Sequence, residues 1–106
     1  MRAVLIPIQF VRVSGPSMSP TLRDGDLVIV RHGAAVRAGD VVLAVFRSMP
    51  GHPVLKRAVR PTDGGWWLAS DNVAAGGDSR SHGIADVTAR VLARRRPGSW
   101  LPRRVR

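Results

Sequence analysis

The feature of this sequence that most constrains its fold is a series of short apolar runs separated by turn residues. The runs are rich in β-branched and aromatic side chains, which favour strands. Asp-Gly, Gly-Asp and Pro-Gly pairs lie between them, where glycine supplies positive φ and aspartate caps its own backbone. The runs cover residues 10–13, 27–30, 41–46, 54–59, 66–69 and 84–93. This pattern predicts a mainly β protein, a small coiled antiparallel β-fold.

The composition supports strands over helices. All seven acidic residues are aspartate, and a single lysine accompanies sixteen arginines. Glutamate and lysine usually fill exposed helix faces, so their near absence, with 11 glycines and 8 prolines, favours strands and turns. We expect at most one short helix, beginning at Ser19-Pro20, because serine caps helices and proline suits their first turn. The absence of cysteine excludes disulfides and thiolate metal sites.

The positive charge is concentrated at one end. The net charge is +10, and six of the 17 basic residues lie in residues 94–106. No repeat or linker divides the chain, so we expect one domain over residues 1–93 and a basic, flexible tail over residues 94–106, with regular structure ending at Arg94. The tail could contact an anionic membrane surface. No nucleic-acid fold signature accompanies the charge, so nucleic acid is not an expected partner.

The first candidate catalytic residue is Ser17, which follows Gly15 and Pro16. A nucleophilic serine needs an exposed hydroxyl, a base, and donors for the developing oxyanion. Glycine and proline make a tight turn that exposes the side chain, and backbone N–H groups around Pro16 and Ser17 would form the oxyanion hole. Taken alone, these residues also fit an ordinary serine-rich turn.

The second candidate is Lys56, the only lysine. In a strand over residues 54–59 it faces the same side as Val54 and Ala58. Burial beside apolar side chains lowers the pKa of an amine, and a neutral amine accepts a proton whereas a guanidinium does not. A general base would explain why arginine is not used here. The alternative is a lysine at a solvated strand edge.

Four segments in this order resemble the signal peptidase I and LexA-type serine peptidase superfamily. They are residues 13–26 around Ser17, residues 37–42, residues 55–59 around Lys56, and residues 70–83. The resemblance covers about residues 10 to 92 and implies a coiled β-fold and a Ser–Lys dyad. It makes Ser17 the nucleophile and Lys56 the general base of an endopeptidase.

The resemblance also implies supporting roles. Ser79 would hydrogen-bond and orient Lys56, Asp78 and Arg80 would brace the site as a pair, and Met18 belongs to the nucleophile segment. Many signal peptidases carry an oxyanion-donating hydroxyl residue at the position of Gly15. A glycine here is similar to LexA-type members. His32, His52 and His82 are scattered, so neither a metal nor a cofactor is expected.

The short length and the LexA-like segment around Ser17 are similar to stand-alone maturation proteases associated with nickel-containing superoxide dismutase. That likeness implies a precursor protein as substrate, cut in an extended N-terminal peptide. No apolar segment approaches the ~20 residues that span a bilayer, so we expect a cytoplasmic protein. Two alternatives stay open: a signal-peptidase-like enzyme, peripheral at the membrane, that cleaves exported precursors, and a non-enzymatic basic binding module.

Overall fold

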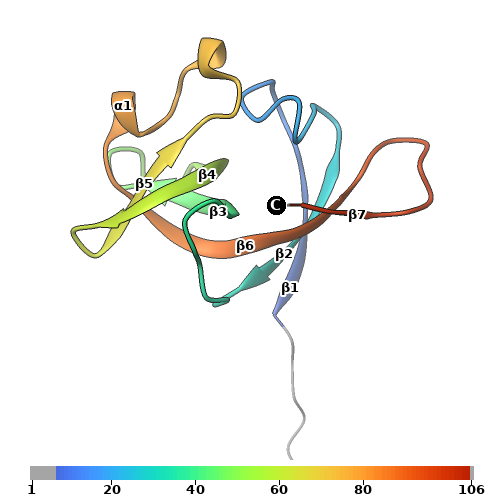
Figure 1. The fold of residues 1–106 in the computed structure, drawn as a ribbon, viewed down its shortest axis with the longest axis horizontal. Helices are drawn as coiled ribbons and strands as arrows, with labels where there is room; N and C mark the ends of the chain where they lie inside the picture. The colour runs from blue at the N-terminus through green and yellow to red at the C-terminus, as the bar shows by residue number, and fades with distance from the viewer. Residues whose placement is uncertain (1–6, 106) are drawn as a thin grey trace, which may run out of the picture.

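The computed structural model describes residues 7–105 and shows a mainly antiparallel β structure (Figure 1). Seven strands, a 3-10 turn and one four-residue helix are present in that range. The predicted fold class is therefore confirmed. The elements are β1 (Ile8–Arg12), β2 (Leu27–His32), β3 (Val41–Phe46), β4 (Pro53–Thr62), β5 (Gly65–Ala69), η1 (Val73–Ala75), α1 (Ser79–His82), β6 (Ala85–Arg95) and β7 (Arg103–Arg104).

The long strand β6 joins the two halves of the sheet. The strand order is β1-β2-β6-β3-β4-β5, and β7 also pairs with β6. Trp66 of β5 pairs with Ala85 at the start of β6, so β6, β3, β4 and β5 form a closed ring of strands. Gly65 permits this closure, because a Cβ there would lie 2.6 Å from the Ala85 carbonyl oxygen and 2.7 Å from Ile84. Any side chain at Gly65 would force the two strands apart.

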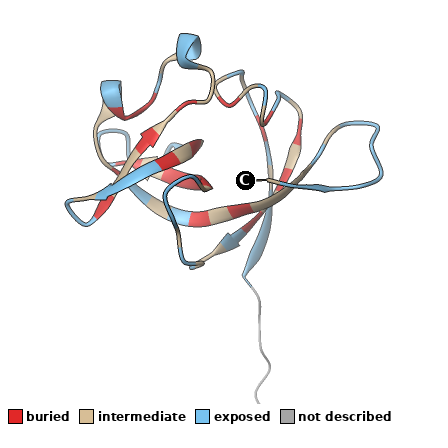
Figure 2. Cartoon of the chain, in the orientation of Figure 1, coloured by how far each residue is buried: buried red, intermediate tan, exposed pale blue. Residues whose placement is uncertain are grey.

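Two hydrophobic cores lie on opposite faces of β3. Alternate residues of a strand point to opposite faces, and β3 is apolar throughout because both of its faces are covered. Val41 and Leu43 join the first core, while Val42, Ala44 and Phe46 join the second. Figure 2 shows buried positions recurring along the central strands. The remaining members of the first core are Val13, Met18, Leu22, Val28, Val30, Ala89 and Val91, and those of the second are Ala58, Leu68 and Ala85.

The helix predicted to start at Ser19-Pro20 does not form. One helical hydrogen bond is present, from the Leu22 N–H to the Met18 carbonyl at 2.9 Å. The following N–H, that of Arg23, donates to the Asp26 carboxylate at 2.9 Å, and this local side-chain bond competes with helix continuation. The segment is a series of turns, and the four-residue helix lies at α1 instead.

Regular structure continues past Arg94, where it was predicted to end. β6 runs to Arg95 because both residues pair with β2. The chain then returns, and β7 pairs with β6 at Arg103 and Arg104 (Figure 1). The loop between them, residues 96–102, projects from the body of the molecule.

Candidate active site

Ser17 and Lys56 line the same cavity, which has a volume of about 390 Å³. The cavity lies between β1 with its following turn on one side and the first half of β4 on the other. Leu43 of β3 contributes from the first core. The other residues around the cavity are Val11, Arg12, Val13, Ser14, Met18, Pro53, Val54 and Leu55. The fold thus brings together two side chains that are 39 positions apart in the sequence.

Ser17 sits in a tight turn that several hydrogen bonds fix. The Ser19 N–H donates to the Pro16 carbonyl at 3.0 Å and closes the turn. From the other side, the Asn72 backbone N–H donates to the Ser17 carbonyl at 2.9 Å, and the Asn72 side-chain amide donates to Pro16 at 3.2 Å. Gly15 enters the turn with φ of +85°, a conformation that favours glycine.

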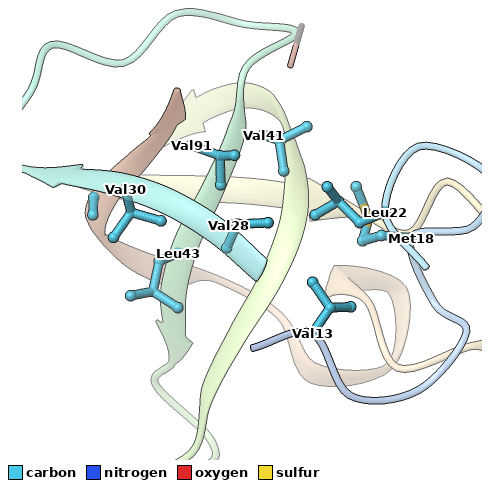
Figure 3. Packing of buried hydrophobic residues seen from close by; sticks show 9 residues of the cluster. Val13, Met18, Leu22, Val28, Val30, Val41, Leu43 and Val91 are labelled. Atoms are coloured by element: carbon cyan, nitrogen blue, oxygen red, sulfur yellow. The ribbon is translucent and has the colours of Figure 1, made fainter. Parts of the chain in front are cut away.

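This turn, which we call the nucleophile turn after the role predicted for Ser17, is anchored in the first core by Met18, the residue after Ser17. Met18 is 1% exposed and Leu22 is fully buried, and Figure 3 shows both at one end of the cluster. The Met18 sulfur also accepts a weak hydrogen bond from the Asp71 N–H at 3.5 Å. Met18, predicted only as a supporting residue, therefore holds the nucleophile turn by packing.

Lys56 is only 5% exposed and pairs with Val42 in the sheet. Burial lowers the pKa of its amine below the ordinary value of 10.5, and the negative charge of Asp78 partly opposes this shift. Among the described residues Lys56 donates no side-chain hydrogen bond, to Ser17 or to any other group. Catalytic hydrogen bonds are often long before substrate binds. The lysine is thus buried, its amine has a lowered pKa, and it lines the cavity.

Asp78 and Arg80 form the predicted pair. Both Asp78 oxygens accept from the Arg80 guanidinium at 3.2 Å, and one also accepts from the Arg80 N–H at 3.1 Å. The Ser70 N–H donates to the second oxygen at 3.3 Å. Burial alone would raise the pKa of Asp78, but these hydrogen bonds outweigh it and hold the pKa below 3.8. Asp78 is therefore an anion close enough to Lys56 to act on its pKa.

Ser79 does not make the hydrogen bond predicted for it. Its hydroxyl is 1% exposed and accepts from the Leu68 N–H of β5 at 2.7 Å, so it fastens α1 to the sheet. Ser70 was not singled out in the sequence, yet the register of β4 and β5 points to it as a neighbour of Lys56. Arg57 pairs with Ala69, so continuing the antiparallel register by one residue sets Ser70 across from Lys56.

The sequence analysis also missed a network that ties the two halves of the site together. The Arg57 guanidinium donates to the Asp71 carboxylate and to the Gly39 carbonyl. The Thr21 hydroxyl donates to the same carboxylate at 2.6 Å. Burial raises the pKa of Asp71, but the hydrogen bonds from Arg57 and Thr21 bring the net value below 3.8. Arg57 follows Lys56 in β4, and Thr21 ends the nucleophile turn. By binding both, Asp71 fixes the position of β4 relative to that turn.

Two arginines of the predicted tail hold the nucleophile turn from behind. The Arg94 side chain donates to the Thr21 carbonyl at 2.9 Å, and the Arg96 side chain donates to the Pro20 carbonyl at 3.0 Å. Arg96 also forms an ion pair at 3.5 Å with Asp26, which is 1% exposed. These contacts join positions at least 70 apart in the chain, so no local pattern could reveal them.

Residues 7–105 contain neither a candidate metal cluster nor a candidate membrane-spanning helix. In that range no group of three or more histidine, cysteine or acidic side chains is arranged to hold a metal ion. No helix within the same residues has the length and apolar character needed to cross a membrane.

Comparison with known proteins places this site in a family. A model of the family "Peptidase S24-like" matches residues 7–91. Mitochondrial inner membrane protease subunit 1 of Homo sapiens is 32% identical over 97 residues. The match covers 69% of this chain and 58% of that protein. The subunit 1 of Schizosaccharomyces pombe is 34% identical over 113 residues, covering 81% of this chain and 72% of that protein.

These relatives refine the sequence-based predictions. The predicted kinship with signal-peptidase-like and LexA-like peptidases is confirmed. The relatives named are inner membrane protease subunits rather than superoxide dismutase maturation proteases, and their location agrees with the membrane alternative. The chain spans 58% of the length of the human relative. Because the family model covers most of the chain, the protein belongs to the Peptidase S24-like family.

Proposed function

We propose that this chain is a serine endopeptidase in which Ser17 is the nucleophile and Lys56 the general base. The observation that carries the proposal is that the two side chains line one cavity and that Lys56 is buried. A buried amine with a lowered pKa has a larger neutral fraction near physiological pH, as a base requires. Family membership independently supports peptidase chemistry.

In the proposed reaction, Lys56 takes the proton of the Ser17 hydroxyl while the oxygen attacks the scissile carbonyl carbon. The tetrahedral intermediate collapses, the peptide C–N bond breaks, and the proton passes from Lys56 to the departing amine. Water then attacks the acyl-enzyme while Lys56 accepts its proton. As the second intermediate collapses, the ester C–O bond breaks and Lys56 returns the proton to the Ser17 oxygen, which releases the acid product.

The Ser17 N–H is the proposed oxyanion donor. Within residues 7–105 this N–H has no acceptor in the protein, so it is available to a developing oxyanion. Pro16 lacks an N–H and contributes only by shaping the turn. The turn is held rigidly by Asn72, and rigid placement is what an oxyanion donor needs.

We propose that Ser70 positions Lys56, the role first assigned to Ser79. Ser70 is 4% exposed, and its hydroxyl donates to the Gly76 carbonyl at 3.0 Å, which leaves its oxygen lone pairs for the ammonium. We expect Ser70→Ala to lower kcat about tenfold with little change in KM. Ser79→Ala should instead lower the melting temperature, because it removes the acceptor for Leu68. If Ser79→Ala lowers kcat and Ser70→Ala lowers only the melting temperature, Ser79 is the residue that positions Lys56.

The proposed substrate is an extended N-terminal segment of a precursor protein. Among residues 7–105, β1 pairs with β2 alone, and β5 covers β4 only from Arg57 onward, so both strands present a free edge beside the cavity. A free edge binds extended peptide by strand addition. The specific substrate that we propose is the precursor of a nickel superoxide dismutase. The names of the relatives favour a second candidate, a precursor presented at a membrane.

The test is to incubate the purified chain with each class of precursor and to sequence the new N-terminus by mass spectrometry. We expect a single cut that Ser17→Ala abolishes. Cleavage of the dismutase precursor in solution supports the first substrate. If only membrane-inserted precursors are cleaved, the substrate is the second candidate, a precursor presented at a membrane. No Ser17-dependent cut of either one would refute the peptidase proposal and favour a binding module.

A further inference from the structure

One face of the sheet, on the side opposite the first core, is apolar along its centre. Residues directly opposite each other in paired strands share a face. Phe10 of β1 lies opposite Ile29 of β2. Ile29 lies opposite Ala93 of β6, and Ala93 lies opposite Arg104 of β7. The four side chains therefore form one row across four strands.

This row points to solvent. Val28 and Val30, the neighbours of Ile29 along β2, are fully buried in the first core, so Ile29 must point the other way. Phe10 is 62% exposed, an unusual environment for a large aromatic side chain. No described segment covers the row, and Figure 2 shows β1 and β7 as exposed strands.

Arginines flank the row on both sides. The two neighbouring cross-strand rows are Ile8–Arg31–Arg90 and Arg12–Leu27–Arg95. Together with Arg104 they give five arginines on what we call the arginine-rich face, and the acidic residue at its border is Asp40, which lines a hollow with Arg90 and Arg104. Within the described part of the chain, none of the five forms an ion pair. The face is thus both apolar and strongly cationic.

The loop over residues 96–102 continues from β6 beside this face. Like the face, it combines exposed apolar side chains with positive charge. Trp100 is 90% exposed and Leu101 is 76% exposed, the two highest values among the large apolar side chains that the structure describes. No acidic residue follows Asp86 in the sequence. Exposed tryptophan and leucine surrounded by arginine are typical of surfaces that enter the interface of a lipid bilayer.

We propose that the arginine-rich face and the 96–102 loop dock on an anionic lipid bilayer. Lipid headgroups neutralise the arginines, while the interface beneath them accepts Phe10, Trp100 and Leu101. A second copy of the chain does not fit, because pairing this face with itself would oppose ten arginines. Nucleic acid would satisfy the charges but offers no apolar phase for Leu101. The docked molecule would hold the cavity close to the bilayer, because β1 leads directly into the nucleophile turn.

Binding can be measured apart from catalysis, by co-sedimenting the purified chain with vesicles. The vesicles contain either phosphatidylcholine alone or an equimolar mixture with phosphatidylglycerol. We expect binding to the anionic mixture only. Phe10→Ser and the pair Trp100→Ser with Leu101→Ser should each weaken it about tenfold or more. Arg95→Gln with Arg104→Gln should weaken it by a similar factor, since each arginine contributes about fivefold.

Matched controls lie outside the cross-strand rows of the arginine-rich face and outside the 96–102 loop. Val73→Ser removes an apolar side chain that is 61% exposed, and Arg37→Gln removes an exposed arginine. Neither should change vesicle binding, and all variants should keep the parent circular dichroism spectrum. Cleavage of a short soluble peptide by the variant with Trp100→Ser and Leu101→Ser should equal that of the parent, because neither residue lines the cavity, so a failure of the catalytic proposal would not affect the docking result.

Three outcomes would overturn the docking proposal. The first is equal binding to both vesicle types, or no binding to the anionic one. The second is a face variant that binds like Val73→Ser. The third is tighter binding to duplex DNA than to anionic vesicles at equal phosphate concentration, with loss in the same variants, which would assign the face to nucleic acid.

Discussion

The proposed nucleophile and the proposed base are positioned by different means. Ser17 lies in an irregular turn, outside any strand, and the turn is held by contacts from distant segments: Asn72, Asp71, Arg94 and Arg96. Lys56 lies inside a ten-residue strand, paired with Val42, and its side chain is hydrogen-bonded to no described residue. One residue is placed by tertiary hydrogen bonds and the other by sheet register and burial.

The difference teaches where each half of the site is vulnerable. A turn with few local hydrogen bonds shifts when a remote partner is removed, even if the fold survives. A strand residue keeps its position unless the sheet unfolds, so its reactivity depends on its electrostatic surroundings instead. Distant substitutions should therefore move Ser17, whereas nearby charges should tune Lys56.

The largest expected effect comes from removing either chemical group. Ser17→Ala and Lys56→Arg should each lower kcat about a thousandfold or more, since loss of a nucleophile or base in serine proteases has effects of this size. Arginine keeps the charge but stays protonated, so it cannot act as a base. Peptide cleavage followed by mass spectrometry measures the loss, and circular dichroism checks the fold. Substantial activity in folded Lys56→Arg protein would exclude Lys56 as the base.

A smaller effect should follow from cutting the link between the two regions. Asp71→Asn weakens the network to Arg57 and Thr21, so we expect kcat to fall about tenfold and stability to fall by about 2 kcal/mol. Asp86→Asn is the control, because its ion pair with Arg47 is largely exposed and should be neutral in both assays.

The stability difference of Asp71→Asn should also depend on pH. The pKa of Asp71 is lowered in the folded state, so its contribution is full above the ordinary value of 3.8 and is lost as the pH falls through the folded value. Urea unfolding of parent and variant should therefore converge in acid. A constant difference down to strongly acidic pH would show that the charge of Asp71 is not the cause.

A third, weaker effect should separate two adjacent arginines. Arg96→Ala removes the hydrogen bond to Pro20 and the ion pair with Asp26, so the nucleophile turn loses a support and kcat should fall about three- to tenfold. Arg95→Ala is the matched control, because Arg95 is exposed and its row points away from the turn. Equal kcat values for the two variants on a soluble peptide would contradict the proposed support.

The contrast between placement by a strand and placement by distant contacts also explains which features could be predicted from the sequence. Apolar runs and turn pairs indicate strands because local side-chain patterns determine them, and Lys56 was found because its strand neighbours are apolar. Ser70 was missed because its position opposite Lys56 depends on the β4–β5 register, which a bulge between Ala58 and Arg60 shifts. Arg96 was assigned to a flexible tail because its partner Pro20 is 76 positions away. Local patterns place elements, whereas register and long-range side-chain bonds appear only after folding.

The smallest expected effect is a shift in the pH profile of cleavage. A lysine base must be neutral, so activity should rise with pH, and its midpoint should lie below 10.5 because burial lowers the pKa of Lys56. The charge of Asp78 raises that pKa. Asp78→Asn should therefore move the midpoint to lower pH while the Lys56 side chain stays in its strand. Asp63→Asn, which removes the same charge at the β4–β5 turn, should leave the profile unchanged.

This shift tests whether charge, rather than hydrogen bonding, controls the base. If the Asp78 carboxylate acted mainly by holding Lys56 in place, Asp78→Asn would lower the plateau rate and leave the midpoint where it was. If it acts through its charge, the midpoint moves and the plateau is largely kept, provided that the asparagine still accepts from Arg80 and Ser70. Rates measured from neutral to strongly alkaline pH with a soluble peptide distinguish the two. A midpoint displaced upward would contradict the electrostatic account, because no loss of negative charge beside an ammonium can raise its pKa.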